Sequence, residues 1–309
     1  MTLALISHPD CLLHDMGPGH PERAERLTAI NDQLIASGLE FVLRHYEAPL
    51  ASDEQLLRVH SAEYLAEVRD TAPASGRIRL DDDAVMNPHT LAAARRAAGA
   101  AVFGVDLVMS GQSEAAFCNV RPPGHHAERA RAMGFCFFNN VAVGAAHALA
   151  VHGLQRVAIV DFDVHHGNGT QAIFEAEPRV LFCSSFQHPF YPYSGTEPAP
   201  EHIVDVALEA GTDGEAFRGA IGERWLPALE RFRPELILIS AGFDAHHEDD
   251  MSDLHLHSSD YGWVTRAVRD IALRHAGGRI VSTLEGGYAL GALGRSVAAH
   301  IDALLGEQG

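Results

Sequence analysis

Apolar residues in this chain occur in two alternating patterns. Short apolar runs, which are typical of strands buried on both faces of a parallel sheet, alternate with longer segments whose apolar residues recur at helical spacing. The predicted strands cover 3–7, 115–119, 157–160, 180–184, 203–208, 236–240 and 279–284. The predicted helices cover 22–36, 52–59, 62–69, 89–109, 141–152, 215–231, 260–275 and 290–305. This alternation predicts an α/β fold over 1–309, a single domain built on one doubly wound, mostly parallel sheet with helices on both faces.

Irregular loops are expected where glycine, proline and polar residues interrupt these patterns. They cover 8–21, 74–88, 121–140 and 185–198. The loop at 121–140 contains the tandem pair His125 and His126, and the loop at 74–88 contains three consecutive acids that end at Asp83. An acid run by itself usually marks only a solvated surface. Long irregular loops in compact domains are more often functional than not.

The strand at 157–160 ends in a concentrated set of polar groups. Asp161, Asp163 and His165 follow it at a spacing of two. If the chain stays extended, their side chains project to one side of the carboxyl edge of the sheet, where open α/β sheets bind ligands. Carboxylates and an imidazole that converge would repel one another or stay partly protonated unless a cation joined them, and this donor set suits zinc better than calcium or magnesium. A divalent metal site is the first hypothesis, and solvated strand-end residues are the alternative.

Other strand ends supply further candidate groups. His125 and His126 follow the strand at 115–119, Asp244 follows the strand at 236–240, and Tyr288 follows the strand at 279–284. The carboxyl ends of parallel strands lie at the same edge of a sheet. We therefore expect all of these groups to meet in one crevice.

The amino-acid composition excludes some classes of binding partner. With 23 basic and 41 acidic residues the formal net charge is −18, which argues against a nucleic-acid surface and against an anionic membrane partner. The four cysteines form no CxxC pair, so we expect reduced thiols rather than a disulfide framework. The first residues do not read as a signal peptide, and no apolar run reaches the length of a membrane span. A cytoplasmic protein is the resulting expectation.

Several motifs occur in a fixed order along nearly the whole chain: GPGHPERAERL, RPPGHHA, GFCFFNNVAV, VDFDVHHGNGTQ, SAGFDAH and LEGGY. Together they resemble the successive signatures of the histone deacetylase and acetylpolyamine amidohydrolase family. HHGNGTQ and GPGHPER are more similar to class II enzymes and to bacterial histone deacetylase-like amidohydrolases than to class I enzymes. The resemblance implies the arginase/deacetylase fold and a zinc-dependent deacetylase activity.

The resemblance also implies a zinc ligand set. Asp163, His165 and Asp244 match the family's ligands to one catalytic zinc ion, and three protein ligands leave an open position. The metal would polarise the scissile amide carbonyl and acidify a bound water. The arginase branch of the fold, which uses two manganese ions, would need more carboxylates in the crevice than this set supplies.

Other matches imply catalytic roles. His126 matches the family's general base and acid, and we expect it to face Asn168. His125 matches its electrostatic partner and should pair with Asp161. Tyr288 matches the tyrosine that donates a hydrogen bond to the developing oxyanion, a role that it would share with zinc.

Residues around the substrate are implied in the same way. Phe135, next to Gly134, and Tyr191 match the two aromatic residues that flank the family's substrate tunnel, although the phenylalanine beside Tyr191 competes for that role. Asp83 stands where class II relatives place an acid that binds the substrate backbone. Met251 stands where polyamine-specific members carry glutamate, which argues modestly against polyamines.

Asp161 and Ser184 match a monovalent cation site of the family, with potassium as the expected ion. The expected substrate is an Nε-acyl-lysine peptide or protein that carries an acetyl or another short acyl group. The nearest alternative is an acetylpolyamine or other small acylated amine. A non-catalytic module that binds acyl-lysine is an alternative of a different class. A homo-oligomer is compatible with the sequence, but no segment indicates an interface.

Overall fold

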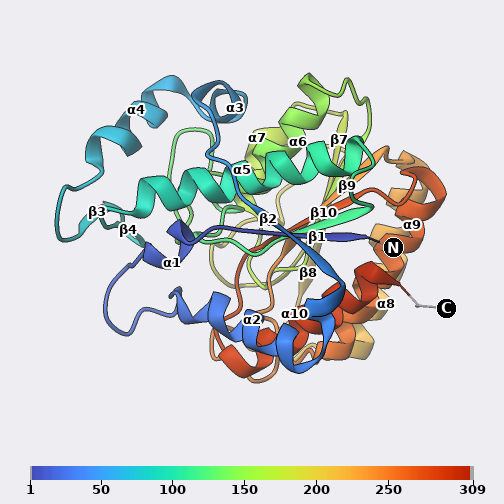
Figure 1. Ribbon diagram of the computed structural model, residues 1–309. Helices are drawn as coiled ribbons and strands as arrows, with labels where there is room; N and C mark the ends of the chain where they lie inside the picture. Colours follow the sequence, from blue (N-terminus) through green and yellow to red (C-terminus); the bar gives the residue numbers. More distant parts are fainter. Residues whose placement is uncertain (1, 307–309) are drawn as a thin grey trace.

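Eight parallel strands form the central sheet of the protein. The computed structural model describes residues 2–306, and its strands lie in the order β2-β1-β5-β10-β9-β6-β7-β8 (Figure 1). Every neighbouring pair is parallel, so the expectation of a mostly parallel, doubly wound sheet is confirmed. The strands are β1 Leu3–Ser7, β2 Leu43–Glu47, β5 Ala115–Cys118, β6 Val157–Asp161, β7 Val180–Gln187, β8 Ile203–Leu208, β9 Leu236–Ala241 and β10 Ile280–Leu284.

Helices cover both faces of this sheet. On β10, Val281 packs against α5, because a Cβ added at Gly104 of that helix would lie 2.9 Å from its Cγ1. The next residue, Ser282, shares a hydrogen bond of 2.8 Å with His300 of α10. Successive strand residues point to opposite faces, so α5 and α10 lie on opposite sides. The helices are α1 Asp10–Leu13, α2 Glu25–Ala36, α3 Asp53–Leu57, α4 Ala62–Thr71, α5 Thr90–Met109, α6 Asn140–Ala150, α7 Asn168–Phe174, α8 Gly214–Phe232, α9 Ser258–His275 and α10 Leu290–Leu305, with the 3-10 turn η1 at Leu39–Val42.

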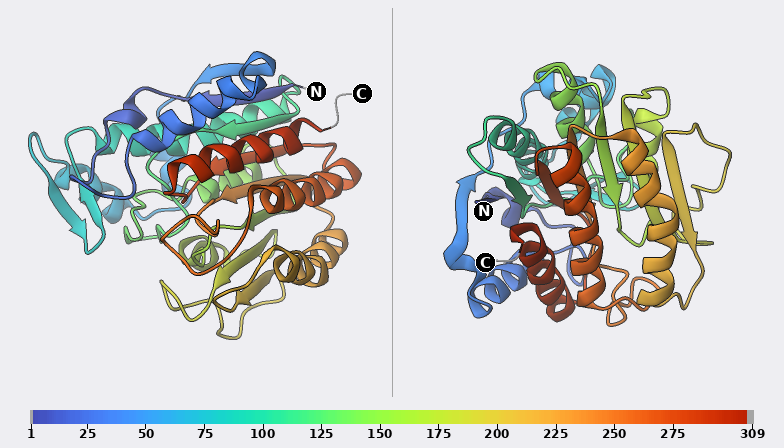
Figure 2. Two further views of the ribbon diagram at one scale, coloured as in Figure 1. Left: turned by 90° about the horizontal axis from the view of Figure 1, so that it is seen from below. Right: turned by 90° about the vertical axis from the view of Figure 1, so that its right-hand side faces the viewer.

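One face carries a row of helices in which α2 packs on α10, α10 on α9, and α9 on α8. Figure 2 shows α8, α9 and α10 side by side. On the other face, α5 packs on α6 and α6 contacts α7. Since both faces are covered, β6, β9 and β10 are buried along their whole length, as their continuous apolar runs predict.

Side-chain caps fix the starts of several helices, among them α4 and α6. The Ser61 hydroxyl accepts a hydrogen bond from the backbone N–H of Tyr64 at 3.1 Å at the start of α4, as expected for a serine cap. Asn139 caps α6 in the same way through the N–H of Ala142, at 3.1 Å. Each such cap contributes about 1 kcal/mol, and the cap on α6 fixes the point at which the loop at 121–140 ends.

Some boundaries differ from the sequence-based expectation. The segment at 74–88 is not wholly irregular, because β3 Ile78–Asp81 and β4 Ala84–Met86 form an antiparallel hairpin. Strand β2 and helix α1 were not expected either. Strand β7 continues to Gln187, three residues beyond the expected end. These elements carry exposed residues or polar residues, so they lack a strong apolar pattern.

All four cysteines, Cys11, Cys118, Cys136 and Cys183, are free and buried, which agrees with the expectation of reduced thiols. Among residues 2–306, no helix is long and apolar enough to cross a membrane.

Candidate active site

The chain turns sharply where β6 ends. The strand stops at Asp161, and the side chain of Asp161 accepts a hydrogen bond from the N–H of Asp163 at 3.1 Å. Asp163 accepts in turn from the N–H of His165 at 2.9 Å. The sequence-based assumption that the strand stays extended through His165 is therefore wrong. The chain bends at each of these acids because an aspartate side chain readily accepts a hydrogen bond from the backbone N–H two residues further on.

Three buried side chains meet at the carboxyl edge of the sheet. Asp163, His165 and Asp244 each offer one ligand atom, and these atoms lie within 4.8 Å of one another. Nδ1 of His165 lies 3.0 Å from Oδ1 of Asp163 and 3.3 Å from Oδ2 of Asp244. Oδ2 of Asp244 is buried and has no hydrogen-bond partner among the described residues. Two carboxylates and one imidazole with an unpartnered oxygen fit a zinc ion that keeps an open fourth position.

Charges within this group are strongly coupled. Burial and the charge of Asp163 raise the pKa of Asp244 to about 6. Burial alone would raise the pKa of Asp163, but His125 and His165 lower it. Burial likewise would lower the pKa of His165, yet Asp163 and Asp244 raise it to about 9. The site therefore concentrates negative charge where it attracts a cation.

Two glycines allow the carboxylates to sit this close to the backbone. A Cβ at Gly286 would lie 2.0 Å from Oδ2 of Asp244, and a Cβ at Gly242 would lie 2.1 Å from Oδ2 of Asp163. The N–H of Gly286 instead donates to Oδ2 of Asp163 at 2.8 Å. Any larger residue at Gly286 would displace the ligand carboxylates.

The tandem histidines have different partners. Nδ1 of His125 lies 2.9 Å from Oδ2 of Asp161, and Nδ1 of His126 donates to Oδ1 of Asn168 at 2.7 Å. Both expected pairings are present. The amide of Asn168 donates from Nδ2 to Glu128 at 2.9 Å, which leaves its oxygen facing His126. Neutral His126 therefore carries its proton on Nδ1 and presents an unprotonated Nε2.

Their pKa values are shifted in opposite directions. Burial opposes protonation of His125, but Asp161 and Asp163 raise its pKa to about 10. Burial and the positive charges of His125 and His165 hold the pKa of His126 well below its ordinary value. The pair thus combines a charged imidazolium with a neutral imidazole, the form required of a general base.

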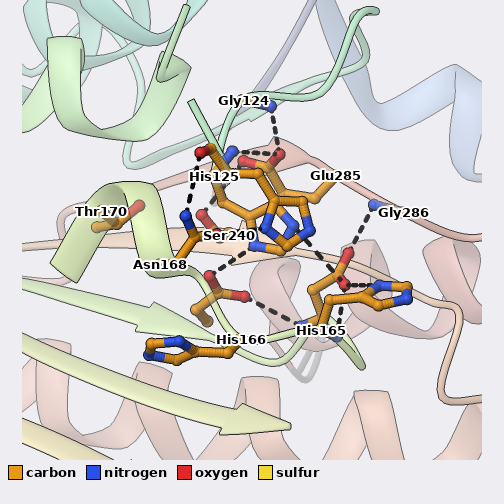
Figure 3. Close-up of polar contacts among 12 residues, drawn as sticks. Gly124, His125, His165, His166, Asn168, Thr170, Ser240, Glu285 and Gly286 are labelled. Carbon is orange, nitrogen blue, oxygen red and sulfur yellow. Dashed lines mark hydrogen bonds and ion pairs between the residues drawn. The ribbon is translucent and has the colours of Figure 1, made fainter. Parts of the chain in front are cut away.

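A buried acid that the sequence reasoning missed supports this pair. Glu285 accepts hydrogen bonds from the N–H groups of Gly124 at 2.6 Å and His125 at 3.1 Å, and from the hydroxyl of Ser240 at 3.2 Å (Figure 3). Burial raises its pKa to about 7. Its position directly before the two glycines of LEGGY was the only available signal. Glu285 fixes the backbone that carries His125.

The loop that carries Tyr288 is held from two sides. Oδ2 of Asp249 accepts from the N–H groups of Tyr288 at 2.6 Å and Ala289 at 2.9 Å. The guanidinium of buried Arg26 lies 4.9 Å from the centre of the Tyr288 ring and donates to the carbonyl of Gly287 at 2.7 Å. Asp249 was not identified as a site residue from the sequence, and its action on this loop, like that of Arg26, was not predicted. Both act through the loop backbone, which no sequence motif reveals.

A pocket of about 250 Å³ opens above these groups. It is lined by Asp83, Pro123, His125, His126, Gly134, Phe135, His165, Phe190, Tyr191, Met251, Gly286 and Tyr288. The structure therefore brings every residue that was expected around the substrate into one cavity. Of the three consecutive acids at 81–83, Asp83 lines the pocket. Asp81 instead pairs with Arg131 at 2.8 Å.

Aromatic rings form much of the pocket wall. Phe135 meets Tyr288 edge-on at 6.2 Å between ring centres. Phe190 stacks on His165 at 5.6 Å, whereas Tyr191 meets His126 edge-on at 5.3 Å. Both members of the Phe190 and Tyr191 pair thus line the cavity. Phe135 adopts a positive φ of 67°, a conformation that is uncommon for a bulky residue.

Asp83 ties two parts of this wall together. Its Oδ1 accepts from the N–H of Gly134 at 2.9 Å, and its Oδ2 accepts from the hydroxyl of Tyr191 at 2.9 Å. A Cβ at Gly134 would lie 2.1 Å from the ring of His126, so only glycine fits at that position. Each oxygen of Asp83 retains a second acceptor site that can face a ligand.

Asp161 and Ser184 lie on adjacent strands, where they are register partners of β6 and β7. Both are buried, and the Ser184 hydroxyl has no hydrogen-bond partner among residues 2–306. An unpartnered buried hydroxyl beside a carboxylate is compatible with an oxygen-ligated cation.

Comparison with known proteins extends these observations. Residues 20–304 match the histone deacetylase domain family. The chain is 42% identical over 302 residues to a histone deacetylase-like amidohydrolase of Pseudomonas aeruginosa. The aligned region covers 90% of this chain and 79% of that protein. The chain is 38% identical to the human polyamine deacetylase HDAC10 over 99% of this chain but only 48% of that protein. The crystal structure of the HDA15 HD domain superposes with a TM-score of 0.92 at 34% identity, over 100% of this chain and 91% of that one.

Proposed function

Because the chain belongs to the histone deacetylase family and is a deacetylase of the amidohydrolase type, we propose that it uses zinc to remove acetyl or another short acyl group from Nε-acyl-lysine. The observation that carries this proposal is the buried group of Asp163, His165 and Asp244, which reaches an aromatic-lined pocket through His165. We take residues 1–309 as one catalytic domain.

Asp163, His165 and Asp244 would hold the zinc ion. When bound, zinc supplies Lewis acidity that polarises the amide carbonyl and lowers the pKa of water. Nε2 of His126 accepts the proton of the attacking water, because its Nδ1 is engaged with Asn168. The same nitrogen then returns the proton to the departing amine.

Two further groups stabilise charge in this mechanism. His125 stays protonated through its pairing with Asp161, so it keeps its neighbour His126 neutral and adds positive potential to the site. Tyr288 donates a hydrogen bond to the oxygen that becomes negative as the carbonyl is attacked. Its loop is fixed in advance by Asp249 and Arg26.

The shape of the pocket supports a lysine-like substrate. Phe135, Phe190 and Tyr191 enclose a cavity of about 250 Å³, a size that suits a slender aliphatic stem. Asp83 would bind the substrate backbone with the acceptor sites that its bonds to Gly134 and Tyr191 leave open. A potassium ion would bind near Asp161 and Ser184, where the unpartnered Ser184 hydroxyl supports an oxygen ligand.

A small acylated amine is the second candidate substrate, since one relative is named a polyamine deacetylase. Met251 lines the pocket and offers no carboxylate to a cationic amine, which favours acyl-lysine. Simple binding of acyl-lysine without hydrolysis is the third candidate. The presence of Tyr288 and of the complete ligand group argues against it.

One substrate panel separates the three candidates. The zinc-loaded protein would be assayed on acetyl-lysine, trifluoroacetyl-lysine and longer acyl-lysine peptides and on acetylpolyamines, with Tyr288→Phe as the control. Loss of one such donor costs about 2.7–4 kcal/mol of transition-state stabilisation, so the variant should be slower by about a hundredfold or more. Turnover of polyamines alone would favour the second candidate, and binding of peptides without turnover would favour the third.

A further inference from the structure

A cluster of three histidines lies on the loop between β9 and α9, separate from the Asp163, His165 and Asp244 group. His246, His247 and His257 each offer one imidazole nitrogen, and these nitrogens lie within 4.8 Å of one another. We propose that this histidine cluster binds a second divalent transition metal ion, with zinc as the representative ion. Imidazole nitrogen is a preferred ligand for zinc, copper and nickel.

Backbone pairing brings the two ends of the loop together. The N–H of Leu256 donates to the carbonyl of Ala245 at 3.0 Å, and the N–H of His247 donates to the carbonyl of Leu256 at 2.9 Å. His247 and His257 consequently lie side by side, with 4.3 Å between their ring centres and 52° between their ring planes. His246 lies 4.5 Å from His247 by the same measure. The arrangement is therefore fixed by the fold rather than by surface side chains alone.

His247 is already oriented as a ligand. Its Nδ1 donates to the carbonyl of Leu256 at 3.3 Å, so in the neutral ring Nε2 keeps its lone pair. A ring N–H bonded to a backbone carbonyl is the usual arrangement behind a metal-bound histidine. His247 and His257 are both exposed, which gives an ion direct access from solvent.

His246 is the ligand that must adjust. It is buried, and its Nδ1 accepts a hydrogen bond from the N–H of Glu248 at 3.1 Å. Binding at this nitrogen would replace that bond, so His247 and His257 are the primary ligands and His246 completes the site. The carboxylate of Glu248 lies 3.8 Å from Nε2 of His247 and also pairs with Arg295 at 2.6 Å.

A second histidine cluster provides an internal comparison. His147 and His152 both place Nε2 2.8 Å from the same oxygen of Asp106. Arg58 donates to Nδ1 of His147 at 3.1 Å, so the proton of neutral His147 must reside on Nε2, where it satisfies Asp106. In that group Nε2 of His147 carries the ring proton and donates it to Asp106, whereas Nε2 of His247 keeps its lone pair because the proton of the neutral ring lies on Nδ1.

A metal ion at the histidine cluster would link the start of the loop to its end. Residues 246 and 247 follow β9 closely, and His257 directly precedes α9. The linked loop contains Asp249, which holds the Tyr288 backbone, and the pocket residue Met251. Closing the loop with a metal would restrict its motion.

Zinc-binding stoichiometry tests the proposal. The protein would be loaded with one equivalent of zinc and then titrated with further Zn²⁺ by calorimetry. His247→Ala and His257→Ala should each weaken the added binding event by about tenfold or more, because each removes a metal ligand. His255→Ala removes a neighbouring exposed histidine outside the cluster and should leave that event unchanged.

The comparison relies on differences between variants, so it does not depend on the proposed function. Equal affinities for the added zinc in the wild type, His247→Ala and His257→Ala would overturn the proposal, as would absence of the event from the wild type. Circular dichroism would verify that each variant is folded. A rise in the thermal midpoint with added zinc, present in His255→Ala and absent from His247→Ala, would support the link across the loop.

Discussion

At the scale of single residues, the partner of His126 decides how readily that imidazole accepts a proton. Asn168 orients the ring through Oδ1, which faces His126 because Nδ2 donates to Glu128, and its neutral amide adds no negative charge. A neutral partner gives the imidazolium less stabilisation than a carboxylate would. The chain therefore combines a precisely oriented base with a low affinity for its proton.

The Asn168→Asp substitution should raise the affinity of His126 for its proton. An added carboxylate favours the protonated ring, so the pKa of His126 should rise from its depressed value, and the limb of the pH–rate profile that His126 governs should move to higher pH. The profile would be measured with kcat/KM on an acyl-lysine peptide. Asn168→Ala, which removes the orienting oxygen without adding charge, should lower the rate without that upward movement. An unchanged profile in Asn168→Asp would contradict this account.

At the scale of elements, two loops share one carboxylate. Asp249 lies on the loop after β9 and holds the N–H groups of Tyr288 and Ala289, which follow β10. Its other oxygen accepts from the N–H of Met251 at 3.1 Å. The tyrosine and a residue of the pocket wall are thus positioned by the same side chain.

Asp249→Ala should loosen the Tyr288 loop without removing the phenol. Misplacement of a catalytic group by about 1 Å can cost on the order of a hundredfold in rate. The kcat of the variant should therefore fall by about tenfold to a hundredfold. Zinc affinity should change little. Asp250→Ala, at the neighbouring exposed acid, provides the matched control. In the Tyr288→Phe background the Asp249 substitution should have little further effect, and full additivity would indicate a different role.

The elements that the sequence predicted best were those with continuous apolar runs. The strands that begin at Leu3, Val157 and Leu236 lie away from the two edges of a sheet covered on both faces, so their composition reports their environment directly. The edge strand β2 reads LRHYE and has three exposed residues, and β3 of the hairpin is short and has no buried residue. Such pairs are fixed by neighbours distant in sequence, which a local pattern does not contain.

The same distinction applies to the candidate site. The grouping of Asp163, His165 and Asp244 near the tandem histidines could be predicted because these residues occur in long motifs at strand ends. Glu285, Asp249 and Arg26 act on backbone groups that only the fold brings near them. Their contributions depend on burial and on distant N–H or carbonyl groups, so no local spacing identifies them.

At the scale of the whole molecule, the site is built by the four central strands. The loops after β5, β10, β9 and β6 carry His126, Tyr288, Asp244 and Asp163, and these strands are consecutive in the sheet order. A metal ion bound there would join loops from across the sheet. Binding to the native state alone stabilises the whole fold.

Removal of zinc should therefore lower the thermal midpoint of the entire chain. An ion present at a hundred times its dissociation constant stabilises the native state by about 2.7 kcal/mol, and the midpoint with excess chelator should be lower by several degrees, on the order expected for a large domain. Scanning calorimetry of wild type and Asp244→Asn would measure this. The variant should lose most of the response, and use of the His247→Ala background would remove any contribution of the histidine cluster. A midpoint that does not depend on zinc in the wild type would contradict the ligand assignment.

Because all four thiols are buried, their reaction with an added chromogenic reagent measures unfolding. Burial raises the pKa of Cys11 to about 11 and that of Cys118 to about 12, and it raises the pKa values of Cys136 and Cys183 as well. The thiolate is the reactive form, so a chromogenic disulfide reagent should release almost no colour from the folded chain at neutral pH. On global unfolding, four equivalents of the coloured product should appear together, one from each cysteine. Earlier release of one equivalent would show that the part of the fold around that cysteine opens first.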